Sequence, residues 1–115
     1  MPHYQQGDII TIPYPFDDFS QSKVRPAIIV GNSRSKVGSY IIAKITTALI
    51  NDTHSFKLNN ADLTVPTAKP CEVRCNELLT ASERVFIRKV TELNKVSLEI
   101  LCEKVKTNFD VSSLI

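Results

Sequence analysis

The chain has 115 residues, of which 43% are hydrophobic and 23% are charged, with 14 Lys and Arg against 12 Asp and Glu. This length predicts one domain over residues 1–115, and the composition is that of a globular protein, not of a disordered or collagen-like chain. The net charge of +2 excludes a strongly basic protein, so any nucleic-acid binding has to come from a few well-placed cations. The sequence contains no glycine-rich phosphate-binding motif.

The sequence predicts neither a membrane span nor a secretory signal. The longest uncharged apolar run is Pro26–Gly31, far short of the roughly 18 residues that a membrane span needs. Residues 1–6 lack the basic and apolar segments of a signal peptide. Cys71, Cys75 and Cys102 are odd in number and lack zinc-site spacing. We therefore expect a cytoplasmic, reduced domain with small buried cysteines and no cofactor or metal.

Three strands are predicted in the first part of the chain. Asp8–Pro13 is rich in β-branched residues. The apolar run Pro26–Gly31 is typical of a strand buried on both faces, and Ser39–Ile45 resumes a strand after a polar turn at Asn32–Gly38. Between the first two strands, Tyr14–Val24 combines proline, aspartate and serine, which predicts a long loop. Because long loops in compact domains are usually functional or disordered, and this one carries aromatic side chains, we expect more than a linker.

The middle of the chain predicts shorter strands. Residues 46–70 are mostly polar and include a short strand at Ser55–Leu58. Glu72–Cys75 predicts another strand that continues to Thr80, whereas Phe86–Val90 fits either a strand or a helical turn.

The last part of the chain predicts one amphipathic helix. Asn94 is a good N-cap for this helix. Five or six short strands followed by a terminal helix predict a mostly β fold, a small barrel or curled sheet with a helix packed on it. The apolar residues at helical spacing are Leu98, Leu101, Cys102, Val105 and Phe109.

Two candidate site residues stand at the ends of predicted strands. Arg25 lies where the loop meets the buried strand, and its forked guanidinium suits a phosphate or carboxylate, although a surface arginine at a sheet edge is the alternative. Thr46 and Thr47 follow the apolar strand that ends at Ile45. If neighbouring strands end at one rim, the Thr46 hydroxyl and the Arg25 guanidinium can bracket one phosphate. Threonine is, however, common in strands simply because it is β-branched.

Other reactive side chains are less well arranged. Asp17 and Asp18 are adjacent, so in an extended chain they point to opposite sides and make a poor metal pair. His3 and His54 could act as acid and base, but one lies at the terminus and the other in a predicted turn.

Taken in order, three segments resemble the PemK/MazF toxins of bacterial toxin–antitoxin pairs. Gly7–Val30 comprises a strand that opens with Gly-Asp, a loop that ends in a Ser-x-x-x-x-Arg-Pro pattern at Ser20–Pro26, and an apolar strand. Ala43–Thr47 is similar to the family's strand that ends in a threonine, and Glu72–Val90 resembles the carboxyl half of PemK-like proteins. The resemblance spans nearly the whole chain.

The resemblance implies an SH3-like barrel of the MazF/CcdB toxin type with a C-terminal helix packed on it, a homodimer, and a cognate antitoxin as partner. It implies a metal-independent, sequence-specific endoribonuclease that cleaves single-stranded RNA through attack by the 2′-OH, leaving a 2′,3′-cyclic phosphate and a 5′-OH. Arg25 and Thr46 match the family's catalytic arginine and threonine. No residue is identified as the general base. The neighbours that would seat the RNA are Ser20, Ser22, Lys23 and Thr47.

The chain departs from the family pattern at two places. Gln21 stands where many members have glycine, and Ala48 and Leu49 follow the threonines where several members have glutamine. Loop stiffness and substrate contacts are therefore expected to differ. Two other functions stay open: a gyrase poison of the same fold, acting through its terminal helix, and a family member that binds RNA without cleaving it.

Overall fold

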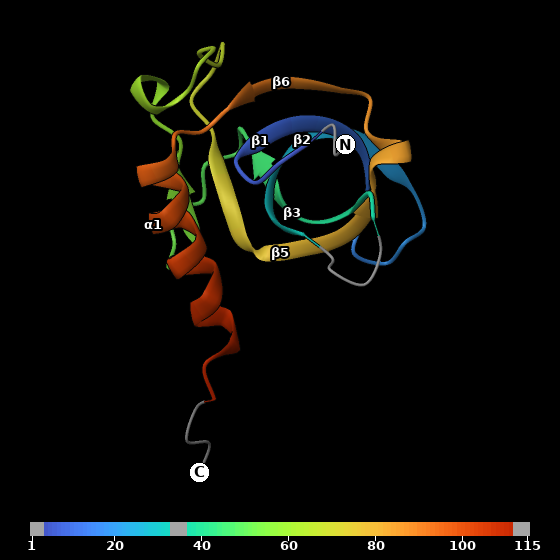
Figure 1. Ribbon diagram of the computed structural model, residues 1–115. Helices are drawn as coiled ribbons and strands as arrows, with labels where there is room; N and C mark the ends of the chain where they lie inside the picture. Colours follow the sequence, from blue (N-terminus) through green and yellow to red (C-terminus); the bar gives the residue numbers. More distant parts are fainter. Residues whose placement is uncertain (1–3, 33–36, 112–115) are drawn as a thin grey trace.

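A computed structural model of the chain describes residues 4–32 and 37–111. In this part of the chain, six strands form one antiparallel sheet in the spatial order β4-β5-β3-β2-β1-β6. Figure 1 shows the sheet curled into a barrel, with helix α1 packed on one side. This confirms the predicted mostly β fold with a C-terminal helix. The elements are β1 (Asp8–Pro15), β2 (Ser22–Asn32), β3 (Ser39–Thr46), β4 (Ser55–Lys57), β5 (Glu72–Ser82), β6 (Arg88–Glu92) and α1 (Lys95–Lys106), with short 3-10 turns at Asn60–Asp62, Glu83–Val85 and Thr107–Phe109.

The sheet buries an apolar cluster on each of its faces, because successive side chains of a strand point to opposite sides. The central part of β2 supplies both clusters: Ala27, Ile28 and Ile29 are all 0% exposed. The predicted burial of this strand on both faces is confirmed. Ile28 belongs to the cluster under α1, which includes Leu101, and its neighbours belong to the opposite cluster.

The loop predicted over Tyr14–Val24 is shorter in the structure. β1 continues to Pro15, β2 begins at Ser22, and these two residues are paired. The strand tolerates its prolines because β6 pairs only with the Asp8–Thr11 part of β1, so beyond that point β1 lies at the edge of the sheet. The connection is Phe16–Gln21, closed by a hydrogen bond from the Phe16 N–H to the Gln21 carbonyl at 2.9 Å.

The C-terminal helix begins where the sequence predicts. The Asn94 side chain accepts a hydrogen bond from the Ser97 N–H at 2.9 Å, as an N-cap does. Leu101 is 0% exposed and Val105 is 7% exposed. Phe109 was expected to continue this apolar face, but α1 ends at Lys106 and Phe109 is 69% exposed. Among the described helices, none is long and apolar enough to cross a membrane.

The remaining predictions are resolved as follows. The segment Phe86–Val90 is a strand only from Arg88 onward. All three cysteines are free; Cys71 and Cys75 are buried as predicted, whereas Cys102 is only partly buried. Four residues of the predicted turn Asn32–Gly38, and also His3, lie outside the described residues.

Candidate active site

Arg25 and Thr46 lie at the same end of the neighbouring strands β2 and β3. The two strands pair antiparallel with Ala27 opposite Lys44 as the last pair at this end, and Arg25 and Thr46 each lie two residues beyond that pair. Because residues two apart share a face, Arg25 lies on the face of Ala27, and Thr46 lies on the face of Lys44. The strand register therefore brings the two predicted residues to one edge of the sheet.

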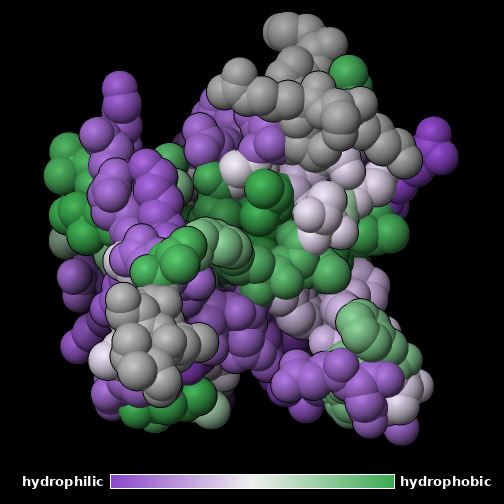
Figure 2. Space-filling view, turned by 90° about the horizontal axis from the view of Figure 1, so that it is seen from below, coloured by the Kyte–Doolittle hydropathy of each residue, from purple (hydrophilic) through white to green (hydrophobic). Residues whose placement is uncertain are grey.

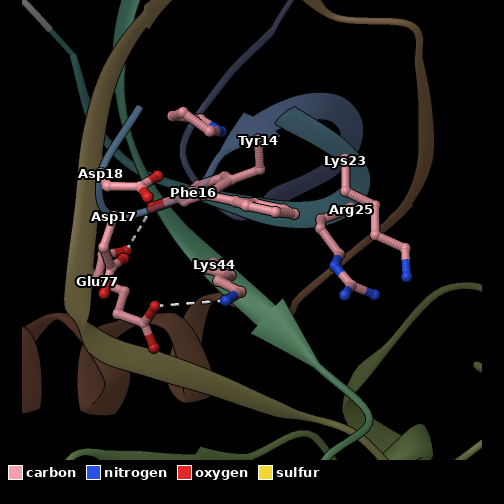
Figure 3. Close-up of a pocket in the computed structure, with 9 residues that line it drawn as sticks. Tyr14, Phe16, Asp17, Asp18, Lys23, Arg25, Lys44 and Glu77 are labelled. Carbon is pink, nitrogen blue, oxygen red and sulfur yellow. Dashed lines mark hydrogen bonds and ion pairs between the residues drawn. The ribbon is translucent and has the colours of Figure 1, made fainter. Parts of the chain in front are cut away.

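Arg25 lines a cavity of about 430 Å³ at this edge. Figure 3 shows Lys23 and Arg25 side by side on one side of this cavity, with Lys44 and Glu77 across from them. Cations and carboxylates share the cavity, which explains how a nearly neutral chain can present a site for an anionic ligand. The lining residues are Tyr14, Pro15, Phe16, Asp17, Asp18, Lys23, Arg25, Lys44 and Glu77.

Two of the cations in the cavity are unpaired. Within residues 4–32 and 37–111, neither the Arg25 guanidinium nor the Lys23 ammonium makes a hydrogen bond or an ion pair. Lys44 differs, because its Nζ lies 3.4 Å from Glu77 Oε1 and 6.0 Å from the centre of the Tyr14 ring. Arg25 and Lys23 therefore keep their donors available for a ligand.

Tyr14 forms a rigid wall of the cavity. It is 8% exposed, and its hydroxyl donates a hydrogen bond to the Glu77 carbonyl at 2.9 Å. Burial raises the pKa of Tyr14 to about 12, and the nearby carboxylates of Glu77 and Asp17 act in the same direction. The phenol stays protonated at neutral pH and serves as a positioning group.

Thr46, the last residue of β3, and Thr47, which follows it, have different surroundings. Thr46 Oγ1 accepts a hydrogen bond from the Ala48 N–H at 3.0 Å, so its own proton stays free to donate. Thr47 instead lines a separate, mostly apolar cavity of about 420 Å³, together with Ile45 and Cys71. Only Thr46 faces the Arg25 side of the sheet.

The loop serines are exposed and lie outside the Arg25 cavity. The Ser20 hydroxyl donates to Asp18 Oδ1 at 2.7 Å, and its N–H donates to the same oxygen at 3.0 Å. These two bonds lower the pKa of Asp18. Ser22 opens β2 opposite Pro15. The loop is therefore held together by its own polar contacts at the rim of the cavity.

Sequence reasoning missed a second arginine site. Arg74 is 4% exposed, and its Nη1 lies 2.8 Å from Glu72 Oε2 and 3.0 Å from Asp52 Oδ1. Ser55 Oγ accepts a further hydrogen bond from Nη1 at 2.8 Å. This arginine is occupied by structural partners. His54 belongs to the same turn, because its N–H donates to Asp52 Oδ1 at 2.9 Å, and it does not line the Arg25 cavity.

Glu77 is the other residue of the site that the sequence did not indicate. It enters the cavity because β5 pairs with β3, and the register of that pair shifts between Ala43 and Ile45. An irregularity of this kind has no clear sequence signal here. Lys44 carried a weak signal, since a charged residue interrupts the apolar strand Ser39–Ile45.

The fold and the site define a small antiparallel barrel protein with unpaired cations in a cavity at one edge of its sheet. A family model described as the PemK-like, MazF-like toxin of type II toxin–antitoxin systems matches residues 5–109, and the chain therefore belongs to this family. The predicted family is confirmed, and the protein is a toxin of the toxin–antitoxin class.

Solved structures of related proteins share the fold. The Mycobacterium tuberculosis toxin MazF-mt6 is 20% identical, with a TM-score of 0.65 over 90% of this chain and 98% of that one. An endoribonuclease in complex with its cognate antitoxin from a mycobacterial species is 12% identical, with a TM-score of 0.73 over 95% of this chain and 97% of that one. MazE–MazF from Deinococcus radiodurans is 12% identical, with a TM-score of 0.72 over 95% and 98% of the two chains. A comparison with curated protein sequences found no match.

Proposed function

We propose that this toxin is a metal-independent, sequence-specific endoribonuclease that cleaves single-stranded mRNA in the cytoplasm. Residues 1–115 form its toxin domain, and Arg25 and Thr46 are its catalytic residues. The observation that supports this proposal is the unpaired Arg25 guanidinium in a cavity at the end of β2, where Thr46 ends the neighbouring strand β3.

The protein does not have to supply a nucleophile, because RNA carries its own. The 2′-OH attacks the adjacent phosphorus, and the P–O5′ bond breaks to leave a 2′,3′-cyclic phosphate and a 5′-OH. Arg25 neutralises the charge that gathers on the phosphoryl oxygens, and the free proton of Thr46 donates to a non-bridging oxygen. Both groups act by positioning and electrostatic stabilisation.

Flanking phosphates extend beyond the cavity. Lys23 lies beside Arg25 in Figure 3 and is exposed, so it is suited to the phosphate next to the cleaved one. Ser20 lies on the adjoining connection and Ser22 opens β2, and both offer hydroxyl donors to the RNA backbone. Thr47 lines the other cavity. It contacts the RNA only where the RNA strand crosses the edge of the sheet.

The proposed protein partners are a second copy of the chain and a cognate antitoxin. One of the similar structures is described as an endoribonuclease in complex with its cognate antitoxin, and another as MazE–MazF. Apolar residues gather in the middle of one face of this chain, with hydrophilic residues around them (Figure 2). A surface of that kind is typical of protein–protein contact. Sedimentation equilibrium of the purified toxin tests the homodimer directly.

The activity is tested by incubating the purified protein with a mixed-sequence RNA in excess EDTA. We expect fragments with 5′-OH and 2′,3′-cyclic phosphate ends, with recurring bases at the cut. A strict requirement for Mg²⁺ contradicts the proposal. RNA that is retained on a filter yet stays intact identifies a binding protein, and intact RNA beside inhibited DNA supercoiling by gyrase identifies the gyrase-poison alternative.

A further inference from the structure

An ion pair between Lys44 and Glu77 lies within the cavity that Arg25 lines. Lys44 Nζ is 3.4 Å from Glu77 Oε1, and the two side chains are 29% and 30% exposed. Figure 3 shows this contact as a dashed line, with both side chains pointing into the space across from Arg25. A proton donor and a proton acceptor thus meet at the proposed cleavage site.

Among the carboxylates that line the cavity, Glu77 is the one held by a strand. Asp17 and Asp18 lie on the exposed connection between β1 and β2. Asp18 is further engaged by two hydrogen bonds from Ser20, which weaken it as a base. Glu77 has both a fixed position and partial access to solvent, as a general base needs.

The contacts of Glu77 leave its oxygens able to accept a further proton. Oε1 lies 3.4 Å from Lys44, and Oε2 lies 3.5 Å from Arg74 Nε. Both contacts are longer than the about 2.7–3.2 Å of a well-formed N–H···O bond. Arg74 Nε is buried and has no hydrogen-bond partner within the described chain. Lone pairs of Glu77 therefore remain open toward the cavity.

We propose that Glu77 is the general base and Lys44 the general acid of this site, an inference that rests on the ribonuclease function proposed above. Glu77 takes the proton of the 2′-OH as the O2′–P bond forms. The P–O5′ bond then breaks, its electron pair stays on O5′, and this oxygen takes a proton from Lys44. An ammonium is a stronger acid than the alcohol it protonates, so the transfer runs downhill.

The direct contact between the two groups restores the site after each cleavage. Glu77 has gained one proton and Lys44 has lost one, so a single transfer across their contact returns both to their starting forms. The cycle needs no further reactant. Arg25 and Thr46 keep their roles in stabilising charge on the non-bridging oxygens.

The test compares two RNA substrates at the bond that the wild type cuts. One is normal RNA, and the other carries sulfur in place of the bridging 5′ oxygen, so that its leaving group departs without a proton. The variants are Glu77→Gln and Lys44→Gln, with Glu99→Gln and Lys57→Gln as matched controls at exposed positions. Binding of a 2′-O-methyl RNA, which lacks the attacking hydroxyl, reports on correct folding.

We expect Glu77→Gln to slow cleavage of both substrates by about 100-fold or more. We expect Lys44→Gln to slow normal RNA similarly but to cut the sulfur substrate at nearly the wild-type rate. Both variants retain binding of the 2′-O-methyl RNA within about threefold, and the controls match the wild type.

Four results overturn the inference. Wild-type rates in both variants, or an equal loss of Lys44→Gln on the two substrates, contradict the acid–base roles while leaving the ribonuclease function intact. Loss of 2′-O-methyl RNA binding in Glu77→Gln shows a structural role instead. Failure of the wild type to cleave RNA at all overturns the proposed function, and the inference with it.

Discussion

Nη1 of Arg74 lies 2.8 Å from Oε2 of Glu72, and these two side chains are 5% and 1% exposed. Arg25 makes no hydrogen bond or ion pair within the described chain and lines the cavity instead. One arginine therefore holds the fold together, and the other is free to bind. The contrast between the two yields a direct test.

Arg74→Met should destabilise the fold by about 3 kcal/mol or more, because it leaves the Glu72 carboxylate buried without its partner. Arg25→Met should change the free energy of unfolding by less than about 0.5 kcal/mol, since it removes no contact. Urea denaturation of the two variants measures both values. Equal destabilisation would show that Arg25 also has a structural role.

The carboxylates that Arg74 binds make the free energy of unfolding depend on pH. Hydrogen bonds from Arg74 hold the pKa of Asp52 well below its usual range. Burial raises the pKa of Glu72, but hydrogen bonds from Ser55 and Arg74 outweigh it and leave that pKa lowered. Because both folded-state values are depressed, their contribution is complete above about pH 4–5 and is lost as the pH falls below that range.

Wild-type stability should therefore decline between about pH 5 and pH 2, and Arg74→Met should show a shallower decline, since the carboxylates have lost their partner. Melting temperatures across this pH range provide the measurement. If the melting temperature of Arg74→Met falls with pH as steeply as that of the wild type, Arg74 is not the cause of the lowered carboxylate pKa values.

Arg25→Ala removes the guanidinium and should reduce the rate of RNA cleavage by about 100–1,000-fold. Arg25→Lys should recover only part of the rate, because lysine keeps the charge but loses the forked donors. Arg84→Ala, which removes an exposed arginine elsewhere, is the matched control. Single-turnover rates on a short RNA compare the three variants, and full activity in Arg25→Ala would exclude it from the site.

Thr46→Val should lower the same rate by removing one hydrogen-bond donor without changing the size of the side chain, an effect of about 100-fold. Thr80→Val, at an exposed position of β5 outside the cavity, serves as its control. If the two variants behave alike, the assignment of Thr46 to the Arg25 edge is wrong.

RNA binding should depend only modestly on salt. Of the cations that line the cavity, Lys23 and Arg25 are unpaired, whereas Lys44 is paired with Glu77. Each phosphate contact to a single strand contributes about 0.7 to the slope of log K against log salt, so we expect a slope of about −1.4 for 2′-O-methyl RNA and of about −0.7 in Lys23→Gln. Lys57→Gln, on the exposed end of β4, should leave the slope unchanged.

Most of the fold is predictable from the sequence because burial follows local pattern. The β-branched run at Asp8–Pro13 and the apolar run at Pro26–Gly31 both form strands. The prolines at positions 13 and 15 led to the prediction of a loop that is too long. A proline is compatible with a strand wherever one edge of that strand lacks a neighbour, and strand order cannot be read from local sequence. The prediction that Phe109 lies on the apolar face of the helix was wrong, because apolar residues at helical spacing continue past the end of α1 at Lys106.

The candidate site was predictable only in part. Arg25 and Thr46 emerged from strand ends and a family pattern, and they lie at the same end of β2 and β3, two residues beyond the pair Ala27–Lys44. Glu77 did not emerge, because it reaches the cavity through an irregular pairing between β3 and β5. Nor does sequence distinguish Arg25 from Arg74, since the difference lies in partners that folding brings from distant segments.

The prolines at the end of β1 have a consequence for the solubility of the protein. Beyond Thr11 this strand has β2 on one side and no paired strand of the described chain on the other. An open edge of that kind invites a strand from another molecule, which is a common start of aggregation. Pro13 and Pro15 offer no N–H to such a strand, so the wall of the cavity can stay uncovered without acting as a template for fibrils.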